Sequence, residues 1–194
     1  IDPRDPEQAA LLALYEGFGD LADEIEQTLR THAFPGSHPG AGVLAEIEML
    51  RIKRQGDPVP RLMAIIDAEV QRDVAAHLSS EIKNGRSSGV IASPLFELAV
   101  AELRRLNPPG SAEKLQPLVA AYDKVVARCN AYLAEHPMAE RQEESLAPAA
   151  KVIPYPSATT RVLAELAGDL GDRELELRTL GGQTLWDQVN ALER

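Results

Sequence analysis

The residues best suited to chemistry are Asp73, His77 and Glu81, which recur at four-residue intervals. On a helix, side chains four positions apart are neighbours on one face. An imidazole between two carboxylates can ligate a metal ion, or act as a base whose tautomer a carboxylate fixes. The same spacing also suits a ladder of ion pairs that stabilises its own helix. We therefore treat the three residues as a candidate metal site, with the ion-pair ladder as the alternative.

Two glycine-containing loops could together form a small-molecule site. The first loop covers residues 33–42 and contains His38, and the second, NGRSSG, contains Arg86, Ser87 and Ser88. Hydroxyl groups flanked by glycine, together with an arginine, can bind an anion, especially near the N-terminus of a helix. The second loop matches no Walker or dinucleotide fingerprint. An ordinary helix end followed by a turn is the alternative interpretation.

The sequence offers little support for nucleophilic catalysis. Cys129 is the single cysteine and falls on the apolar stripe of its expected helix, where a buried structural thiol is the usual outcome. A single cysteine also excludes an intramolecular disulfide and a zinc site built from several cysteines. No serine has the flanking residues of a nucleophile elbow. We assign no catalytic residue, and the sequence favours a protein that is not an enzyme.

The elements that would position these residues are expected to be helices. Three helix starts are recognisable as a capping residue followed by proline, at Asp5 and Pro6, Asp57 and Pro58, and Ser93 and Pro94. Apolar periodicity predicts helices over residues 6–31, 43–55, 58–83, 94–106, 117–135, 157–167 and 184–193. Gly17 and Gly19 are expected to divide the first of these helices. Residues 175–180 fit a strand or a short helix.

The sequence therefore predicts an all-α fold, an irregular bundle of about five main helices with a short helical C-terminal appendage. Aromatic residues are scarce at 4%, so alanine and leucine supply most of the apolar mass, as helix-on-helix packing requires. We assign residues 1–136 to the bundle and residues 137–156, which are polar with scattered alanine and proline, to a linker. Residues 157–194 are expected to dock on the bundle or on a second chain.

The net charge and the hydropathy of the chain argue against two classes of partner, nucleic acids and membranes. The net charge of -10 disfavours nucleic acid, and the small basic cluster of Arg51, Lys53 and Arg54 has no interleaved aromatic residues to stack on bases. No stretch approaches the roughly 18 apolar residues of a membrane span. One cysteine and the absence of a membrane segment suit a reducing cytoplasm.

These patterns favour a non-enzymatic cytoplasmic interaction protein, an adaptor, a chaperone-like factor or a regulatory domain, that binds a protein partner or forms a homodimer. Several amphipathic helices and an apolar tail need a partner surface. The alternative is a helical enzyme or sensor that binds a small molecule or metal through Asp73, His77 and Glu81, or through the loops with His38 and Arg86. Convergence of these side chains on a pocket would favour the alternative.

Overall fold

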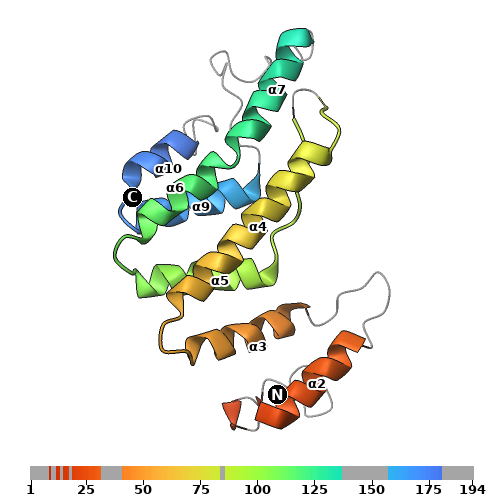
Figure 1. Cartoon of the computed structure of the whole chain (residues 1–194), viewed down its shortest axis with the longest axis vertical. Coiled ribbons are helices and arrows are strands. Elements are labelled where there is room, and N and C mark those ends of the chain that lie inside the picture. Colours follow the sequence, from red (N-terminus) through yellow and green to blue (C-terminus); the bar gives the residue numbers. More distant parts are fainter. Residues whose placement is uncertain are drawn as a thin grey trace. The chain divides into compact units, whose positions relative to one another are not determined.

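The computed structural model describes residues 9, 12–13, 15–17, 19–31, 41–83, 86–136 and 157–180. In this part of the chain every regular element is an α-helix, apart from an isolated antiparallel bridge between Lys83 and Arg86 (Figure 1). The predicted all-α class is therefore confirmed for the described residues. In chain order the helices are α2 (Gly19–Thr31), α3 (Ala41–Lys53), α4 (Val59–Ser79), α5 (Pro94–Leu106), α6 (Ser111–Ala120), α7 (Asp123–Glu135), α9 (Ala158–Asp169) and α10 (Arg173–Leu180).

Two of the three predicted caps lie in the described residues, and both form. Asp57 Oδ1 accepts a hydrogen bond from the Val59 N–H at 3.1 Å, and Ser93 Oγ accepts one from the Phe96 N–H at 3.3 Å. Each bond satisfies an N–H that has no partner within its own helix. The helix starts at α4 and α5 are therefore confirmed, whereas the predicted start at residues 5–6 lies outside the described residues.

The structure corrects the predicted helix over residues 117–135. That stretch belongs to two helices, because α6 begins at Ser111, contains Pro117 and ends at Ala120 before α7 begins at Asp123. Proline has no N–H to donate within a helix, so α6 loses one internal bond. The N–H groups of Ala121 and Tyr122 then close α6 on the carbonyls of Pro117 and Val119. This break places Tyr122 between two helices.

Internal contacts divide the chain into two compact units. The first unit is Ile1–Ile65 with Ser93–Ala101, and the second unit is Ile66–Ala92 with Glu102–Arg194. Both units take part of α4 and part of α5, whereas α6, α7, α9 and α10 belong to the second unit. The expected linker over residues 137–156 lies outside the described residues, so a linker there stays a prediction.

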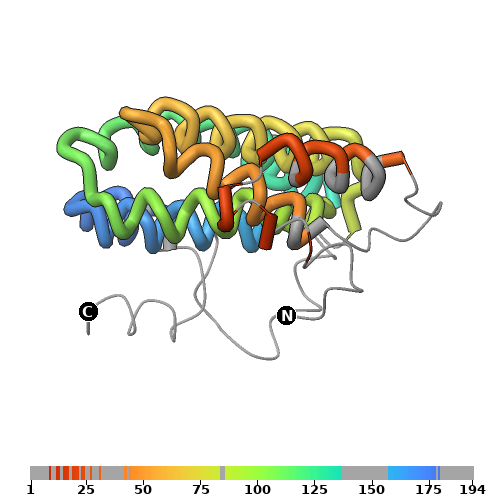
Figure 2. The backbone as a smooth tube through the Cα atoms, turned by 90° about the horizontal axis from the view of Figure 1, so that it is seen from below, coloured from red at the N-terminus to blue at the C-terminus, as the bar shows by residue number. Residues whose placement is uncertain are grey.

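In the second unit, α9 packs against α6 and against α10, and the blue end of the tube in Figure 2 shows α9 and α10 side by side. Ser157 starts α9 with a capping box, in which its hydroxyl accepts from the Thr160 N–H at 3.2 Å. Gly168 of α9 lies directly against the carboxylate of Glu176, where a Cβ at residue 168 would clash. Glu176 is 1% exposed and also pairs with Arg173. The glycine is what allows this close contact of the two helices.

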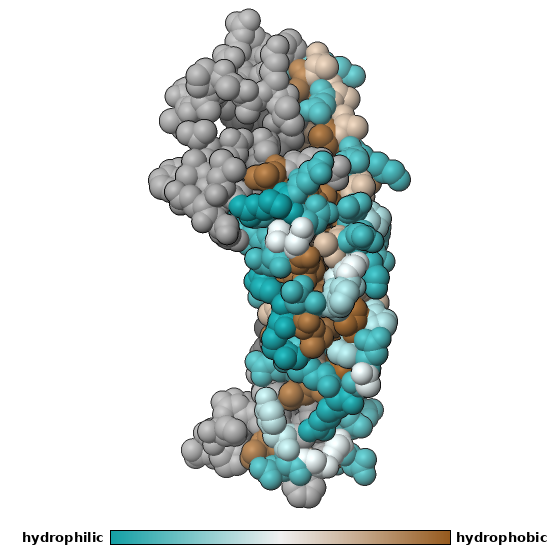
Figure 3. Space-filling view, turned by 90° about the vertical axis from the view of Figure 1, so that its left-hand side faces the viewer, coloured by the Kyte–Doolittle hydropathy of each residue, from teal (hydrophilic) through white to brown (hydrophobic). Residues whose placement is uncertain are grey.

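The surface mixes polar and apolar side chains. On the side drawn in Figure 3 hydrophilic and hydrophobic residues are interspersed. Among the described residues the exposed large apolar side chains are Leu12, Tyr15, Leu21, Leu78, Ile91 and Leu177. Ile91 is 92% exposed, well above the next value of 65%. No described helix combines the length and the apolar character that a membrane span requires.

Candidate functional site

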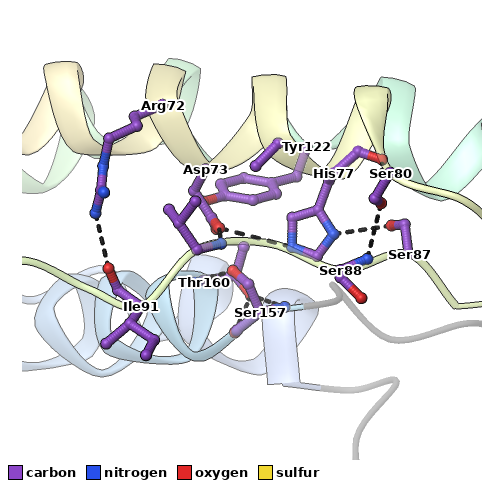
Figure 4. Close-up of polar contacts among 12 residues, drawn as sticks. Arg72, Asp73, His77, Ser80, Ser87, Ser88, Ile91, Tyr122, Ser157 and Thr160 are labelled. Carbon is purple, nitrogen blue, oxygen red and sulfur yellow. Dashed lines mark hydrogen bonds and ion pairs between the residues drawn. The ribbon is translucent and has the colours of Figure 1, made fainter. Parts of the chain in front are cut away.

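Five polar side chains meet inside the second unit, where α4 faces the connection to α5, and Figure 4 shows four of them, Asp73, His77, Ser87 and Tyr122. This polar cluster consists of Asp73, His77, Ser87, Tyr122 and Cys129. All five residues are buried, and the most exposed is Ser87 at 9%. Two come from α4, one from the connection to α5, one from the break between α6 and α7, and one from α7.

Asp73 is the acceptor that joins these elements. Its Oδ2 accepts from the Tyr122 hydroxyl at 2.6 Å, and its Oδ1 accepts from the Val90 N–H at 2.9 Å. A buried carboxylate is costly unless such donors replace its water. Asp73 therefore ties α4 both to the α6–α7 break and to the chain that follows α4.

His77 lies one turn further along the same face of α4. Its Nδ1 is 2.8 Å from Ser87 Oγ, and the Cys129 thiol donates to that oxygen at 3.7 Å. Its Nε2 faces Asp73 Oδ1 at 3.8 Å, beyond hydrogen-bond distance, and has no hydrogen-bond partner among the described residues. One nitrogen of the ring is thus bonded, and the other only faces a carboxylate.

Burial sets the protonation states of the two ring side chains. It lowers the pKa of His77 below its ordinary value, although the negative charge of Asp73 acts in the opposite direction. It raises the pKa of Tyr122 far above its ordinary value, and the hydrogen bond to Asp73 adds to this effect. At neutral pH the cluster therefore holds a neutral imidazole and a protonated phenol.

Residues 86–92, which we call the strap, run alongside α4 over this cluster (Figure 4). Three backbone groups of the strap are anchored by side chains of the α4 region. Apart from the bond of Val90 to Asp73, the Ser88 N–H donates to Ser80 Oγ at 2.9 Å and the Ile91 carbonyl accepts from Arg72 at 2.7 Å. The strap is therefore held at positions 88, 90 and 91.

Gly89 brings the strap into direct contact with the cluster. A Cβ at this position would lie 2.8 Å from His77 Cδ2 and closer still to His77 Nε2 and Asp73 Oδ1. Any larger residue would have to push the strap away from α4. The Gly89 backbone therefore covers the imidazole and the carboxylate.

Arg128 of α7 explains why α4 ends at Ser79 rather than at residue 83, as the sequence predicts. Its guanidinium donates to the carbonyl of His77 at 2.7 Å and to that of Ser80 at 2.8 Å. The last carbonyls of a helix need partners from outside the helix, and a side chain can supply them. The end of α4 is thus set by a residue distant in the sequence.

The early end of α4 separates Glu81 from the other two residues of the predicted metal site. Glu81 follows the helix, its side chain is 78% exposed, and it lies 3.6 Å from Lys83 Nζ. The structure brings Asp73 and His77 together but leaves Glu81 outside. Within the described residues no three His, Cys, Asp or Glu side chains are placed to hold a metal ion.

The predicted loop site is also divided. Ser87 points into the polar cluster, whereas Arg86 and Ser88 are exposed. His38 lies outside the described residues. The three neighbours in the NGRSSG loop therefore do not act as one set of ligands.

Sequence reasoning missed Tyr122, Cys129 and Gly89. The first two share a seven-residue spacing, which predicts a common apolar face and gives no sign of the carboxylate that the face meets. The glycine of the strap was a usable signal, because an isolated glycine can mark a close approach of the backbone.

The order Asp73, His77 and Ser87 contains the side chains used in nucleophilic catalysis. In this arrangement the Gly89 backbone lies directly against the imidazole and the carboxylate. No family model, curated protein or solved structure matches the chain.

Proposed function

We propose that the chain is a non-enzymatic cytoplasmic interaction protein of the adaptor or regulatory kind, and that it forms a homodimer through the strap. One observation carries the proposal: the Ile91 side chain is 92% exposed although its backbone is anchored. A large aliphatic side chain on an anchored backbone can be buried by a partner with little further loss of backbone entropy.

The anchors of the strap favour binding because they order it in advance. Bonds at positions 88, 90 and 91 fix the backbone before any partner arrives. Ordering a flexible segment on binding opposes association, and a segment that is already ordered avoids most of that loss. Ile91 therefore lies on a segment whose backbone is already ordered before a partner binds.

A second copy of the chain is the partner that suits this surface. Residues 87–92 carry no charge, in a chain with 26% charged residues and a net charge of -10. Two straps related by a two-fold axis bring Ile91 against its counterpart, with Arg72, which binds the Ile91 carbonyl, beside the contact in both copies. Burying each isoleucine contributes about 1.5–3 kcal/mol. Since association also has an entropic cost, the two isoleucines support only a weak dimer, and we expect a Kd of about 1 mM or above.

The test is sedimentation equilibrium of the full chain over a range of concentrations. We expect a reversible dimer that Ile91→Ser weakens at least about tenfold, because the substitution removes two buried side chains. Leu177→Ser on α10, where the leucine is 37% exposed, is the matched control and should leave the Kd unchanged. Raising the salt concentration should tighten the dimer, since it screens the repulsion between two acidic chains. A wild type that stays monomeric, or an Ile91→Ser dimer as tight as the wild type, would overturn the proposal.

The alternative function, a small-molecule or metal-binding enzyme or sensor, lacks a comparable observation in the described residues. Arg86 and Glu81 are exposed, away from the buried Asp73 and His77. A shallow groove of 390 Å³ in the first unit is lined in part by Glu48 and Arg61, which pair with each other at 3.2 Å. None of the groove's lining residues belongs to the predicted site.

A further inference from the structure

We propose that protonation of His77 favours release of the strap and so couples self-association to pH. This inference rests on the proposed function, because it concerns the regulation of the same surface. In the structure the strap lies against the polar cluster, which we call the closed arrangement. The inference follows from the surroundings that a second proton on the imidazole would meet there.

In the closed arrangement no acceptor lies within hydrogen-bond distance of Nε2. His77 Nδ1 already shares a hydrogen bond with Ser87, and Nε2 is 3.8 Å from the nearest carboxylate oxygen. Both oxygens of Asp73 already accept bonds, one from Tyr122 and one from Val90. An imidazolium would therefore be buried without a hydrogen-bonded counter-ion, which is strongly unfavourable.

The other groups around the ring do not offset this effect. The α6–α7 break contributes the Tyr122 phenol, whose ring edge meets the imidazole at a centroid distance of 6.4 Å. From α7 come the Cys129 thiol and the cationic Arg128, which binds the backbone carbonyl of His77. The strap brings Ser87, and its one titratable side chain, Arg86, is exposed. Among the described residues Asp73 is thus the one anion that faces the ring, and burial outweighs it.

In the open form the strap has moved away from α4 and no longer covers the His77 ring. The Gly89 backbone leaves the imidazole, and water can then solvate the protonated form, which returns its pKa to about 6.5. Because the open form binds the proton more readily than the closed form, acid shifts the equilibrium toward the open form. The ratio of open to closed straps therefore rises between pH 7.5 and pH 5.5, by about tenfold at most, a limit reached when the closed form stays neutral.

Hydrogen exchange of the Val90 amide measures this opening directly, because that N–H is bonded to Asp73. The measurement uses the full chain at a concentration where it is monomeric, with exchange corrected for its intrinsic dependence on pH. We expect the opening constant of the wild type to rise severalfold, by about tenfold at most, from pH 7.5 to pH 5.5 and that of His77→Gln to stay constant. His136→Gln, at an exposed histidine after α7, is the matched control and should follow the wild type.

A titration of the wild type by NMR covers the case in which His77→Gln does not fold. The strap amides should shift with the same midpoint as the His77 ring protons. Strap amides that stay unchanged while the ring titrates would overturn the inference, as would a His77→Gln variant with the opening profile of the wild type.

The dimer experiment separates the two proposals. At pH 5.5 the wild-type dimer should be weaker than the His77→Gln dimer in proportion to the loss of closed straps that the Val90 amide reports, whereas at pH 7.5 the two should be equal. A chain that never dimerises but opens its strap in acid refutes the proposed function alone. A dimer with the same Kd in both proteins at pH 5.5, with Val90 equally protected, refutes the switch alone.

Discussion

Replacing Tyr122 with phenylalanine removes one hydroxyl from the polar cluster and keeps the ring that packs beside His77. The lost hydroxyl donates to Asp73 Oδ2 at 2.6 Å, and both residues are 0% exposed. In Tyr122→Phe the buried carboxylate keeps the Val90 N–H and loses the phenol donor. The variant therefore tests whether this bond holds α4 to the α6–α7 break.

The expected loss follows from the charge and burial of the acceptor. Hydrogen bonds to charged groups contribute about 1.5–3 kcal/mol, and an acceptor left buried without its donor lies at the upper end of that range. We expect the free energy of unfolding to fall by about 2–3 kcal/mol. For a urea slope of about 2 kcal/mol per molar, the unfolding midpoint falls by about 1–1.5 M.

Urea unfolding followed by circular dichroism measures the change. Tyr132→Phe is the matched control, because Tyr132 is half-buried and stacks on His136 through its ring, which phenylalanine preserves. That variant should stay within about 0.5 kcal/mol of the wild type. In an Asp73→Asn background, Tyr122→Phe should cost only about 1 kcal/mol, because the acceptor is then neutral.

The reasoning is refuted if Tyr122→Phe unfolds within about 0.5 kcal/mol of the wild type. It is refuted equally if the loss is the same in the Asp73→Asn background, since the effect would then come from something other than the charged acceptor.

Three further predictions concern backbone approach, capping and titration. Gly89→Ala should lower the free energy of unfolding by about 1–3 kcal/mol through overpacking against the cluster, whereas Gly56→Ala, with open space around the new methyl group, should not; thermal unfolding compares the two. Ser157→Ala should lower stability by about 1 kcal/mol and reduce the helix signal, because the N-cap of α9 loses its acceptor; Ser157→Thr should retain most of both. Stability should fall above pH 10 by about 1.4 kcal/mol per pH unit in the wild type and less in Tyr122→Phe, because the raised pKa of Tyr122 keeps the folded phenol protonated while the unfolded phenol ionises.

For each of these three predictions, one experimental result would contradict the reasoning. Equal effects of alanine at residues 89 and 56 would show that the strap has room at residue 89. An unchanged α9 in Ser157→Ala would show that packing alone starts the helix. A Tyr122→Phe variant with the alkaline profile of the wild type would assign that loss to other residues.

Helix starts were predictable because their signals are local. Ser93 and Pro94 are adjacent, and α5 begins at Pro94 and ends at Leu106, as the sequence predicts. Ser157 caps α9 in the same way, with both partners of the capping box within three residues. The end of α4 was not predictable, because Arg128, some fifty positions away, supplies the partners for its last carbonyls.

The candidate site shows the same difference between local signals, which were predictable, and tertiary contacts, which were not. Asp73 and His77 are four positions apart, so their shared face follows from helix geometry alone. The donors that Asp73 meets are tertiary, since Tyr122 arrives from the α6–α7 break and Val90 from the strap. Glu81 belongs to the predicted set only as long as α4 continues beyond Ser79, so one error in a helix end removed it from the site.

The contact between Gly168 and Glu176 has a consequence for how the chain can change by mutation. A side chain at residue 168 would strike the Glu176 carboxylate, so it becomes acceptable only after residue 176 has become smaller. That first substitution removes the partner of Arg173 and has its own cost. The two positions are therefore epistatic: substitution at 176 must precede substitution at 168, and the reverse order passes through a clashing intermediate.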